Sequence, residues 1–295
     1  MDGLFSKYKN YIYLHLIIFI WGFTAILGEL ISVSTYQLVI TRLIIAAVSI
    51  FIWIIYRKIN FKISTRHLGY YLVTGFIIAA HWYFFFESIE ISTVSIGLIG
   101  LSSSTLFTAF IEPFFFKRKI TFYEILLGLF IIFGIYLIFN FQPEYVKGLA
   151  YSLAAGFFGS LFTVINGKLA RNNHDPSVIS FYEFLGGIIP LFLLVLLSGD
   201  FNASFFNFGL NDSIYLLILG TICTALAFVG SVAVMKEITP FTLIVAVNLE
   251  PIYGIILAWI IFDEASKMSA GFYLGSAVIL GSVFINAYLK AKKRI

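Results

Sequence analysis

The sequence predicts an all-α integral membrane protein with ten transmembrane helices, arranged as two inverted five-helix repeats. Hydrophobic residues make up 60% of the 295 residues and charged residues only 12%, a balance that excludes an ordinary soluble domain. The apolar residues gather in runs of about twenty, the length of helix that crosses a bilayer core about 30 Å thick. Several short motifs also recur half a chain apart, which indicates an internal repeat.

Ten apolar runs follow one another with short polar connections. Lys7 and Lys9 precede the first run, as basic residues do in a signal peptide. No small-residue cleavage site follows them, so we expect this helix to be retained. The predicted helices cover residues 11–28, 35–56, 68–87, 93–116, 121–140, 148–170, 176–197, 213–235, 241–262 and 270–290.

The basic residues predict the orientation of the chain. All but three of the 19 Lys and Arg residues lie before the first helix, after the last one, or in the connections on that same side; the exceptions are Arg42, Lys147 and Lys267. Because Lys and Arg collect in cytoplasmic loops, we expect both termini in the cytoplasm, with the protein in a bacterial-type inner (plasma) membrane. The basic clusters then reflect topology and contact with the lipid bilayer, and nucleic acid is not an expected partner.

The repeat divides the chain into residues 1–147 and 148–295. Each half contains five predicted helices, an odd number, so the second half must enter the membrane upside down relative to the first. Transporters with such inverted repeats bind substrate near the midplane, at the interface of the two halves. The motifs that match at an offset of 147 residues are Glu90-Ile91-Ser92 with Glu237-Ile238-Thr239, and Gly128 and Gly134 with Gly275 and Gly281.

Glu250 and Pro251 lie at the middle of the predicted helix 241–262. A charged side chain near the bilayer midplane costs about 3 kcal/mol, so this carboxyl should face water, a ligand or a partner. Glu250 either binds substrate or a coupling proton, or it forms a structural hydrogen bond across the kink that Pro251 introduces. Asn248 and Tyr253 are further polar residues in the middle of this helix and are candidates for the same site. The repeat aligns Ser103 with Glu250.

Arg42 is a second charge inside a predicted helix. Its planar guanidinium suits a carboxylate, so it binds either a ligand carboxylate or an acid of the protein. A weaker match at an offset of 141 residues pairs Arg42 with Glu183, which makes Glu183 a candidate for an ion pair or a gate. Asn166, toward the cytoplasmic end of its helix, is either a packing residue or part of an inner gate.

Aromatic side chains near the same depth are candidates for the substrate site. Trp21 and Trp82 either stack on an apolar or cationic ligand or pack as ordinary core residues. His81 precedes Trp82; it either lines the site or forms a hydrogen bond to a neighbouring helix. No catalytic or metal-binding residue is predicted.

Taken together, these residues resemble the drug/metabolite transporter superfamily of the EamA type. The resemblance is carried by Trp21-Gly22 in the first helix, Arg42 early in the second, and Glu264 followed eleven residues later by Gly275. The chain departs from the family pattern at Lys117, where an acid equivalent to Glu264 is frequent, and at Thr35, where proline is usual. The resemblance implies export or exchange of small metabolites, often amino acids or related amphiphiles, through a central cavity. It also implies that the fifth and tenth helices lie away from this cavity, where a homodimer or scaffold contact is an option.

The function we predict is therefore secondary transport of a small molecule, by alternating access around a midplane cavity, with Glu250 as the candidate for proton coupling. An ATP-driven pump is excluded because no Walker-type P-loop occurs, and a metalloprotease because no His-Glu-x-x-His motif occurs. No cofactor is expected, and a single cysteine, Cys223, argues against redox chemistry. The alternatives are a channel and an intramembrane serine-protease-like enzyme, which the segment Gly100-Leu101-Ser102-Ser103 together with His81 suggests.

Overall fold

The computed structural model describes residues 2–120, 122–171 and 174–292, and these form helices without any strand. Eight helical segments are long and apolar enough to cross a membrane. Two further helices, α7 (Phe122–Phe141) and α14 (Ala270–Lys292), contain shorter apolar stretches. The chain is thus a multi-pass, all-helical membrane protein, and the number of ten spans remains a prediction.

Most predicted helices have close counterparts in the structure. Side-chain caps fix several of their starts: for example, Ser34 before α3, Ser64 before α4 and Asp175 before α9 each accept a hydrogen bond from a backbone N–H of the first turn, which satisfies one of the donors left free there. The uninterrupted helices are α3 (Thr35–Tyr56), α4 (Thr65–Glu90), α7, α8 (Val146–Leu169), α9 (Pro176–Ser198) and α14, with short 3₁₀ turns at Pro143–Tyr145 (η1) and Glu264–Lys267 (η3).

Four predicted helices prove to be interrupted. The first is broken at Phe23 into α1 (Asp2–Gly22) and α2 (Thr24–Leu30), and the fourth at Ser102 and Ser103 into α5 (Val94–Leu101) and α6 (Ser104–Phe116). The ninth is broken at Asn248 into α12 (Pro240–Val247) and α13 (Leu249–Phe262), next to Pro251. The eighth consists of α10 (Leu210–Ile218), a π-helix η2 (Leu219–Leu226) and α11 (Ala227–Val234).

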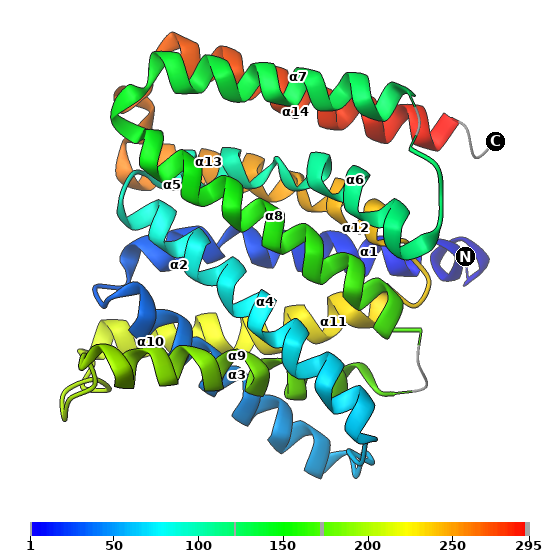
Figure 1. The fold of residues 1–295 in the computed structure, drawn as a ribbon, viewed down its shortest axis with the longest axis vertical. Helices are drawn as coiled ribbons and strands as arrows, with labels where there is room; N and C mark the ends of the chain where they lie inside the picture. Colours follow the sequence, from blue (N-terminus) through cyan, green and yellow to red (C-terminus); the bar gives the residue numbers. More distant parts are fainter. Residues whose placement is uncertain (1, 121, 172–173, 293–295) are drawn as a thin grey trace.

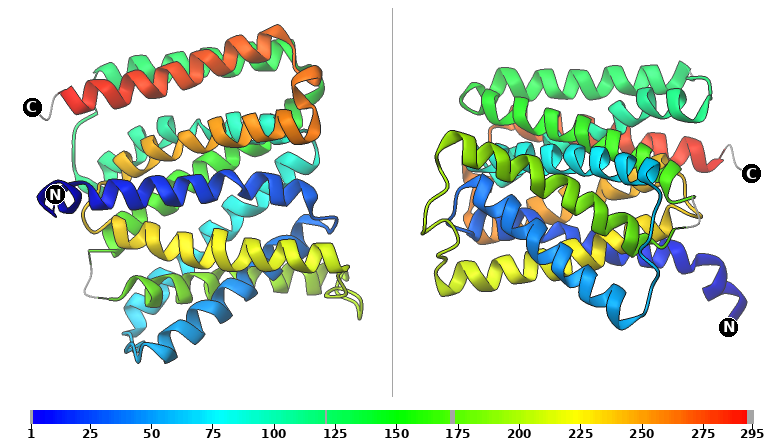
Figure 2. Two further views of the ribbon diagram at one scale, coloured as in Figure 1. Left: turned by 180° about the vertical axis from the view of Figure 1, so that it is seen from behind. Right: turned by 60° about the horizontal axis from the view of Figure 1, so that its bottom comes forward.

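The two halves meet through their broken helices. Segments α5–α6 and α12–α13 lie antiparallel, because Glu264, just after α13, contacts the start of α5, while Glu112, near the end of α6, contacts the start of α12. Seen from behind, α14, α13, α1 and α11 follow one another across the molecule (Figure 2). On the other side, α4 packs against both α8 and α9.

Helices α7 and α14 form a pair at one edge of the molecule (Figure 1). Gly134 and Gly275 lie at their crossing: a Cβ atom added to Gly275 would lie 2.6 Å from the carbonyl oxygen of Gly134. Backbones approach this closely only where both residues lack a side chain. Gly134 and Gly275 therefore allow these two helices to pack closely.

The start of α1 and the end of α14 lie at the same end of the molecule (Figure 1). We call this the terminal end, and the other the opposite end. The connections α3–α4, α6–α7, α8–α9 and α11–α12 also reach the terminal end. All basic residues except Arg42, Lys147 and Lys267 lie in the two termini, in these connections or in the helix turn next to one of them.

Candidate functional site

A cavity of about 80 Å³ lies among the interrupted helices. Five residues that the sequence predicts as substrate-binding line it: Trp21, Arg42, His81, Trp82 and Glu250. Trp21 is the next-to-last residue of α1, and Glu250 is the second residue of α13, so each lies close to a helix break. Residues at the α5–α6 break, Leu101 and Ser104, complete this pattern. The breaks thus turn toward the cavity, where free backbone groups are not exposed to lipid.

Arg42 lies in this cavity wall with its side chain almost fully buried, at 1% exposure. Its guanidinium lies 4.0 Å above the ring centroid of Trp82, and its Nε donates a hydrogen bond of 2.5 Å to Thr224 Oγ1. Nη1 is buried without a partner. The ion pair with Glu183 that the sequence suggested does not form, because Glu183 contacts Asn166 instead. The Nη1 edge of the Arg42 guanidinium is therefore free to bind a ligand.

The π-helix η2 forms hydrogen bonds to two residues of the cavity wall, Trp21 and Arg42. Its wider turn directs the Oγ1 of Thr224 to the carbonyl of Leu219, five residues back, and toward Arg42. The carbonyl oxygen of Cys223 accepts a hydrogen bond of 3.1 Å from Trp21 Nε1. Segments of π-helix are rare and often occur at functional sites. Here the segment anchors a tryptophan of α1 and the arginine of α3.

Glu250 has 6% of its surface exposed and forms no hydrogen bond with any part of the chain that the structure describes. It also forms no ion pair with any residue of the described ranges, where the ion pair that is present joins Glu112 to Arg118. A structural hydrogen bond across the kink is therefore not seen for Glu250. The cavity holds one positive and one negative side chain, Arg42 and Glu250, that do not neutralise each other by direct contact.

Aromatic rings form much of the remaining wall. His81 Nδ1 lies 2.8 Å from the carbonyl oxygen of Ala155, so this nitrogen carries the hydrogen and donates it. The ring of His81 also lies edge-on to Phe162, at 5.3 Å between centroids. Trp82 contacts Phe184 and Phe228 at 5.7 and 6.1 Å. His81 and Trp82 thus serve in packing and also face the cavity, so both interpretations apply to them.

Three predicted substrate-binding residues lie outside the cavity wall. Ser103 packs against Gly156 of α8, and its neighbour Ser104 takes its place in the wall. Asn248 donates hydrogen bonds of 2.7 Å to Thr105 Oγ1 and to the carbonyl of Ile244, and so ties the two broken helices together. Tyr253 packs against Gly22 of α1. Because Ser103 is not part of the wall that contains His81, the structure gives no support to a serine-protease-like pair.

Asn166 and Glu183 lie together but away from the cavity. Asn166 Nδ2 donates a hydrogen bond of 3.3 Å to Glu183 Oε2, and both residues are fully buried. The wall residues that the sequence did not indicate are mainly uncharged and apolar, such as Phe228 on α11 and Leu243 on α12. Apolar residues occur throughout the helices, so only the rotation of each helix about its axis distinguishes those that line the cavity from those that do not.

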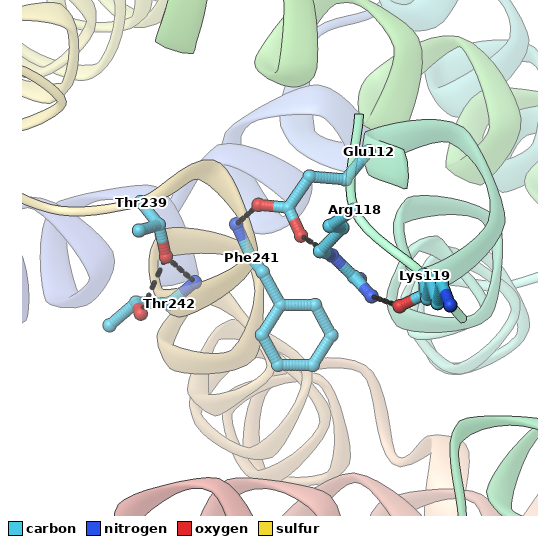
Figure 3. A network of polar contacts seen from close by, with 6 residues as sticks. All are labelled: Glu112, Arg118, Lys119, Thr239, Phe241 and Thr242. Atoms are coloured by element: carbon cyan, nitrogen blue, oxygen red, sulfur yellow. Dashed lines mark hydrogen bonds and ion pairs between the residues drawn. The ribbon is translucent and has the colours of Figure 1, made fainter. Parts of the chain in front are cut away.

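Carboxylates close both ends of the broken-helix pair. At the opposite end, Glu264 accepts hydrogen bonds of 2.9 Å from the backbone N–H groups of Val94 and Ser95, the first residues of α5. At the terminal end, Glu112 accepts a hydrogen bond of 3.4 Å from the N–H of Phe241 in the first turn of α12 (Figure 3). Its other oxygen accepts one of 3.0 Å from Arg118 Nε. We call these two contacts the opposite-end cap and the terminal-end cap.

The two caps explain the departure from the family pattern at Lys117. In the repeat register, Lys117 corresponds to Glu264, and Phe241 corresponds to Val94. The helix start at Phe241 does receive a carboxylate, but from Glu112, one turn earlier than the repeat predicts. Arg118 holds this carboxylate in place. Negative charge is stabilised at helix starts, so both ends satisfy the same physical need.

Comparison with known proteins agrees with this architecture. The model of the EamA-like transporter family matches residues 9–140 and 146–288, one match in each half. A crystal structure, described only as that of a protein, superimposes with a TM-score of 0.68 at 17% sequence identity, and the match covers 95% of this chain and 98% of that chain. At this identity the likeness concerns the fold alone. No curated protein matches the sequence.

Proposed function

The chain belongs to the EamA-like transporter family, and from this membership and the cavity we propose that it is a secondary transporter of small zwitterions, with amino acids as the leading class. Amphiphilic compounds with the same pair of charges belong to this class. The aromatic wall favours substrates with an apolar or aromatic side chain.

The observation that carries this proposal is the pair of unneutralised charges in one cavity. The free Nη1 of Arg42 suits a substrate carboxylate, and the free carboxylate of Glu250 suits a substrate ammonium. An uncompensated charge inside the membrane is costly, so a zwitterion that pairs with both residues is favoured over a ligand with one charge. The ring of Trp82 lies 4.0 Å from the guanidinium of Arg42 and holds it at the wall through a cation–π contact.

The size of the cavity supports a mechanism of alternating access. A cavity of about 80 Å³ is smaller than the roughly 150 Å³ that holds a benzene molecule. A substrate with an aromatic side chain therefore requires the lining helices to separate. The broken helices, which carry Leu101, Ser104 and Glu250 into the wall and end in the two caps, are the elements we expect to move.

Glu250 supports the proposal of proton coupling and of a direction of transport. Either a proton or a substrate ammonium can neutralise this carboxylate, but not both at once. Each substrate that leaves Glu250 is then replaced by a proton, which makes the cycle an exchange. With the terminal end in the cytoplasm of a bacterial-type plasma membrane, an inward proton gradient drives export of the substrate.

The test is counterflow in proteoliposomes with three related probes: phenylalanine, phenethylamine and 3-phenylpropionate. We expect saturable counterflow of phenylalanine by the wild type and little of the other two, since each lacks one charge. Glu250→Gln should lose phenylalanine counterflow and its dependence on a pH gradient. Arg42→Gln should lose phenylalanine counterflow while retaining some phenethylamine transport.

Glu87→Gln is the matched control, because Glu87 lies on α4 but outside the cavity wall. It should behave as the wild type. If Glu250→Gln and Arg42→Gln both retain wild-type counterflow and selectivity, the charge pair does not form the substrate site. Flux that does not saturate would indicate a channel instead.

A further inference from the structure

Glu183 is a buried carboxyl that the proposed substrate site does not use. Glu183 lies on α9 and has 0% of its surface exposed. Asn166 on α8 and Ser180, one turn before Glu183 on α9, are also 0% exposed. Helix α4 crosses α9 at this point: a Cβ atom added to Gly75 would lie 1.8 Å from the carbonyl oxygen of Glu183. The carboxyl is therefore enclosed by packed helices rather than by the cavity.

The polar atoms of this cluster do not balance if Glu183 is ionised. Asn166 Nδ2 donates to Glu183 Oε2, while Glu183 Oε1 and Asn166 Oδ1 are both buried without a partner. An ionised carboxylate and an amide oxygen are acceptors only, so two acceptors are left without a donor. A neutral carboxylic acid has one O–H group. Donated to the amide oxygen, it completes a two-bond pair of acid and amide.

No cation of the neighbouring helices compensates a charge on Glu183. Arg42 on α3 is bonded to Thr224 and stacked on Trp82, and α11 has no titratable side chain. On α4, His81 bonds to the carbonyl of Ala155. Toward the terminal end, the titratable groups on α4 are Arg66, which is exposed and bonds to Tyr70, His67, which bonds to Ser64, and Tyr71, which bonds to His174; on α8 it is the exposed Lys168.

We propose that Glu183 and Asn166 form a proton-binding site, separate from the cavity, in which one proton completes the acid–amide pair between α8 and α9. Loss of this proton leaves an uncompensated charge and two unpaired acceptors between packed helices, which is unfavourable. Helix α4, packed against both α8 and α9, carries His81 and Trp82 to the cavity. The pair therefore adjoins two helices, α4 and α8, that also line the substrate cavity.

The experiment uses the full-length protein in lipid nanodiscs and does not depend on substrate. Infrared spectroscopy at neutral pH detects the C=O stretching band of a neutral carboxylic acid. Glu250→Gln is the background, since it removes the carboxyl of the cavity. We expect the band in Glu250→Gln and its loss in the double variant Glu250→Gln/Glu183→Gln. Adding Asn166→Leu to the same background should shift the frequency of the band, because the amide partner is gone.

The melting temperature provides a second readout. In the Glu250→Gln background, thermal stability should fall as pH rises above about 4.3, the ordinary pKa of a glutamate, and it should not fall in Glu250→Gln/Glu183→Gln, whose amide at position 183 can still pair with Asn166. His174 has the opposite effect on the pH dependence of stability. Burial and the neighbouring His67 lower the pKa of His174. Its neutral form therefore contributes stability above the ordinary pKa of 6.5, and this contribution is lost as pH falls.

Three results would overturn the proposal. One is a band that is unchanged when Glu183→Gln is added to the background. Another is a loss of stability with rising pH that is the same in Glu250→Gln and in Glu250→Gln/Glu183→Gln. The third is stabilisation of the wild type, but not of Glu183→Gln, by sodium relative to choline, which would make this a sodium site. Because none of these readouts involves transport, they leave the proposed substrate site unaffected.

Discussion

Thr224 is the residue that fixes the direction of the Arg42 guanidinium. Its hydroxyl donates to the carbonyl of Leu219 and accepts from Arg42 Nε. Thr224→Val keeps the shape but removes the acceptor. A hydrogen bond to a charged group contributes about 1.5–3 kcal/mol, so we expect the KM for a zwitterionic substrate to rise between about tenfold and a hundredfold, with a smaller change in kcat.

Two matched variants test this prediction. Thr224→Ser retains the hydroxyl and should restore the wild-type KM. Thr221→Val changes a threonine of the same π-helix, whose hydroxyl bonds only to the carbonyl of Leu217, and should leave the KM unchanged. A KM that rises equally in Thr221→Val and Thr224→Val would mean that the π-helix itself is perturbed, and not the orientation of Arg42.

At the scale of elements, the crossing of α7 and α14 depends on two glycines. Gly275→Ala places a methyl group 2.6 Å from the carbonyl oxygen of Gly134, and overpacking of this kind costs about 1–3 kcal/mol. We expect a lower melting temperature for Gly275→Ala. Gly281→Ala, on the same helix, meets no atom within 4 Å and should be neutral or slightly stabilising, because alanine favours helix more than glycine does.

At the scale of the whole molecule, the two caps define which end of the cavity opens. The opposite-end cap has two hydrogen bonds of 2.9 Å, whereas the terminal-end cap has one of 3.4 Å and shares its carboxylate with Arg118. A cap of this kind contributes about 1–2 kcal/mol. Glu264→Gln should therefore raise the population open at the opposite end about five- to thirtyfold, and Glu112→Gln the population open at the terminal end.

Thiol labelling measures these populations. In a Cys223→Ser background, Ser104→Cys places one thiol in the cavity wall, and a membrane-impermeant maleimide is applied to either side of oriented vesicles. Glu264→Gln should speed labelling from outside and Glu112→Gln from the cytoplasmic side, while Glu144→Gln, exposed on η1, should change neither. Faster labelling from the reversed sides would contradict the predicted cytoplasmic termini; unchanged rates in both variants would limit the caps to folding.

The sequence by itself determined the membrane class, most helix positions and the family. It also indicated Arg42 and Glu250, because a charge inside an apolar run must turn away from lipid, and this constraint is visible in one dimension. The break at Asn248 was anticipated through Pro251, which cannot donate a helical hydrogen bond. The breaks at Phe23 and Ser103, and the π-helix at Leu219–Leu226, have no such residue to mark them.

Only the tertiary structure decided which of these polar residues meet. Ser104 rather than Ser103 lines the cavity, because neighbours on a helix point about 100° apart and the break sets the phase. Arg42 meets Thr224, and Glu183 meets Asn166, although the repeat aligns Arg42 with Glu183. Residues that correspond in an inverted repeat are related by symmetry, and symmetry does not place them in contact; the packing of α3, α9 and the π-helix does.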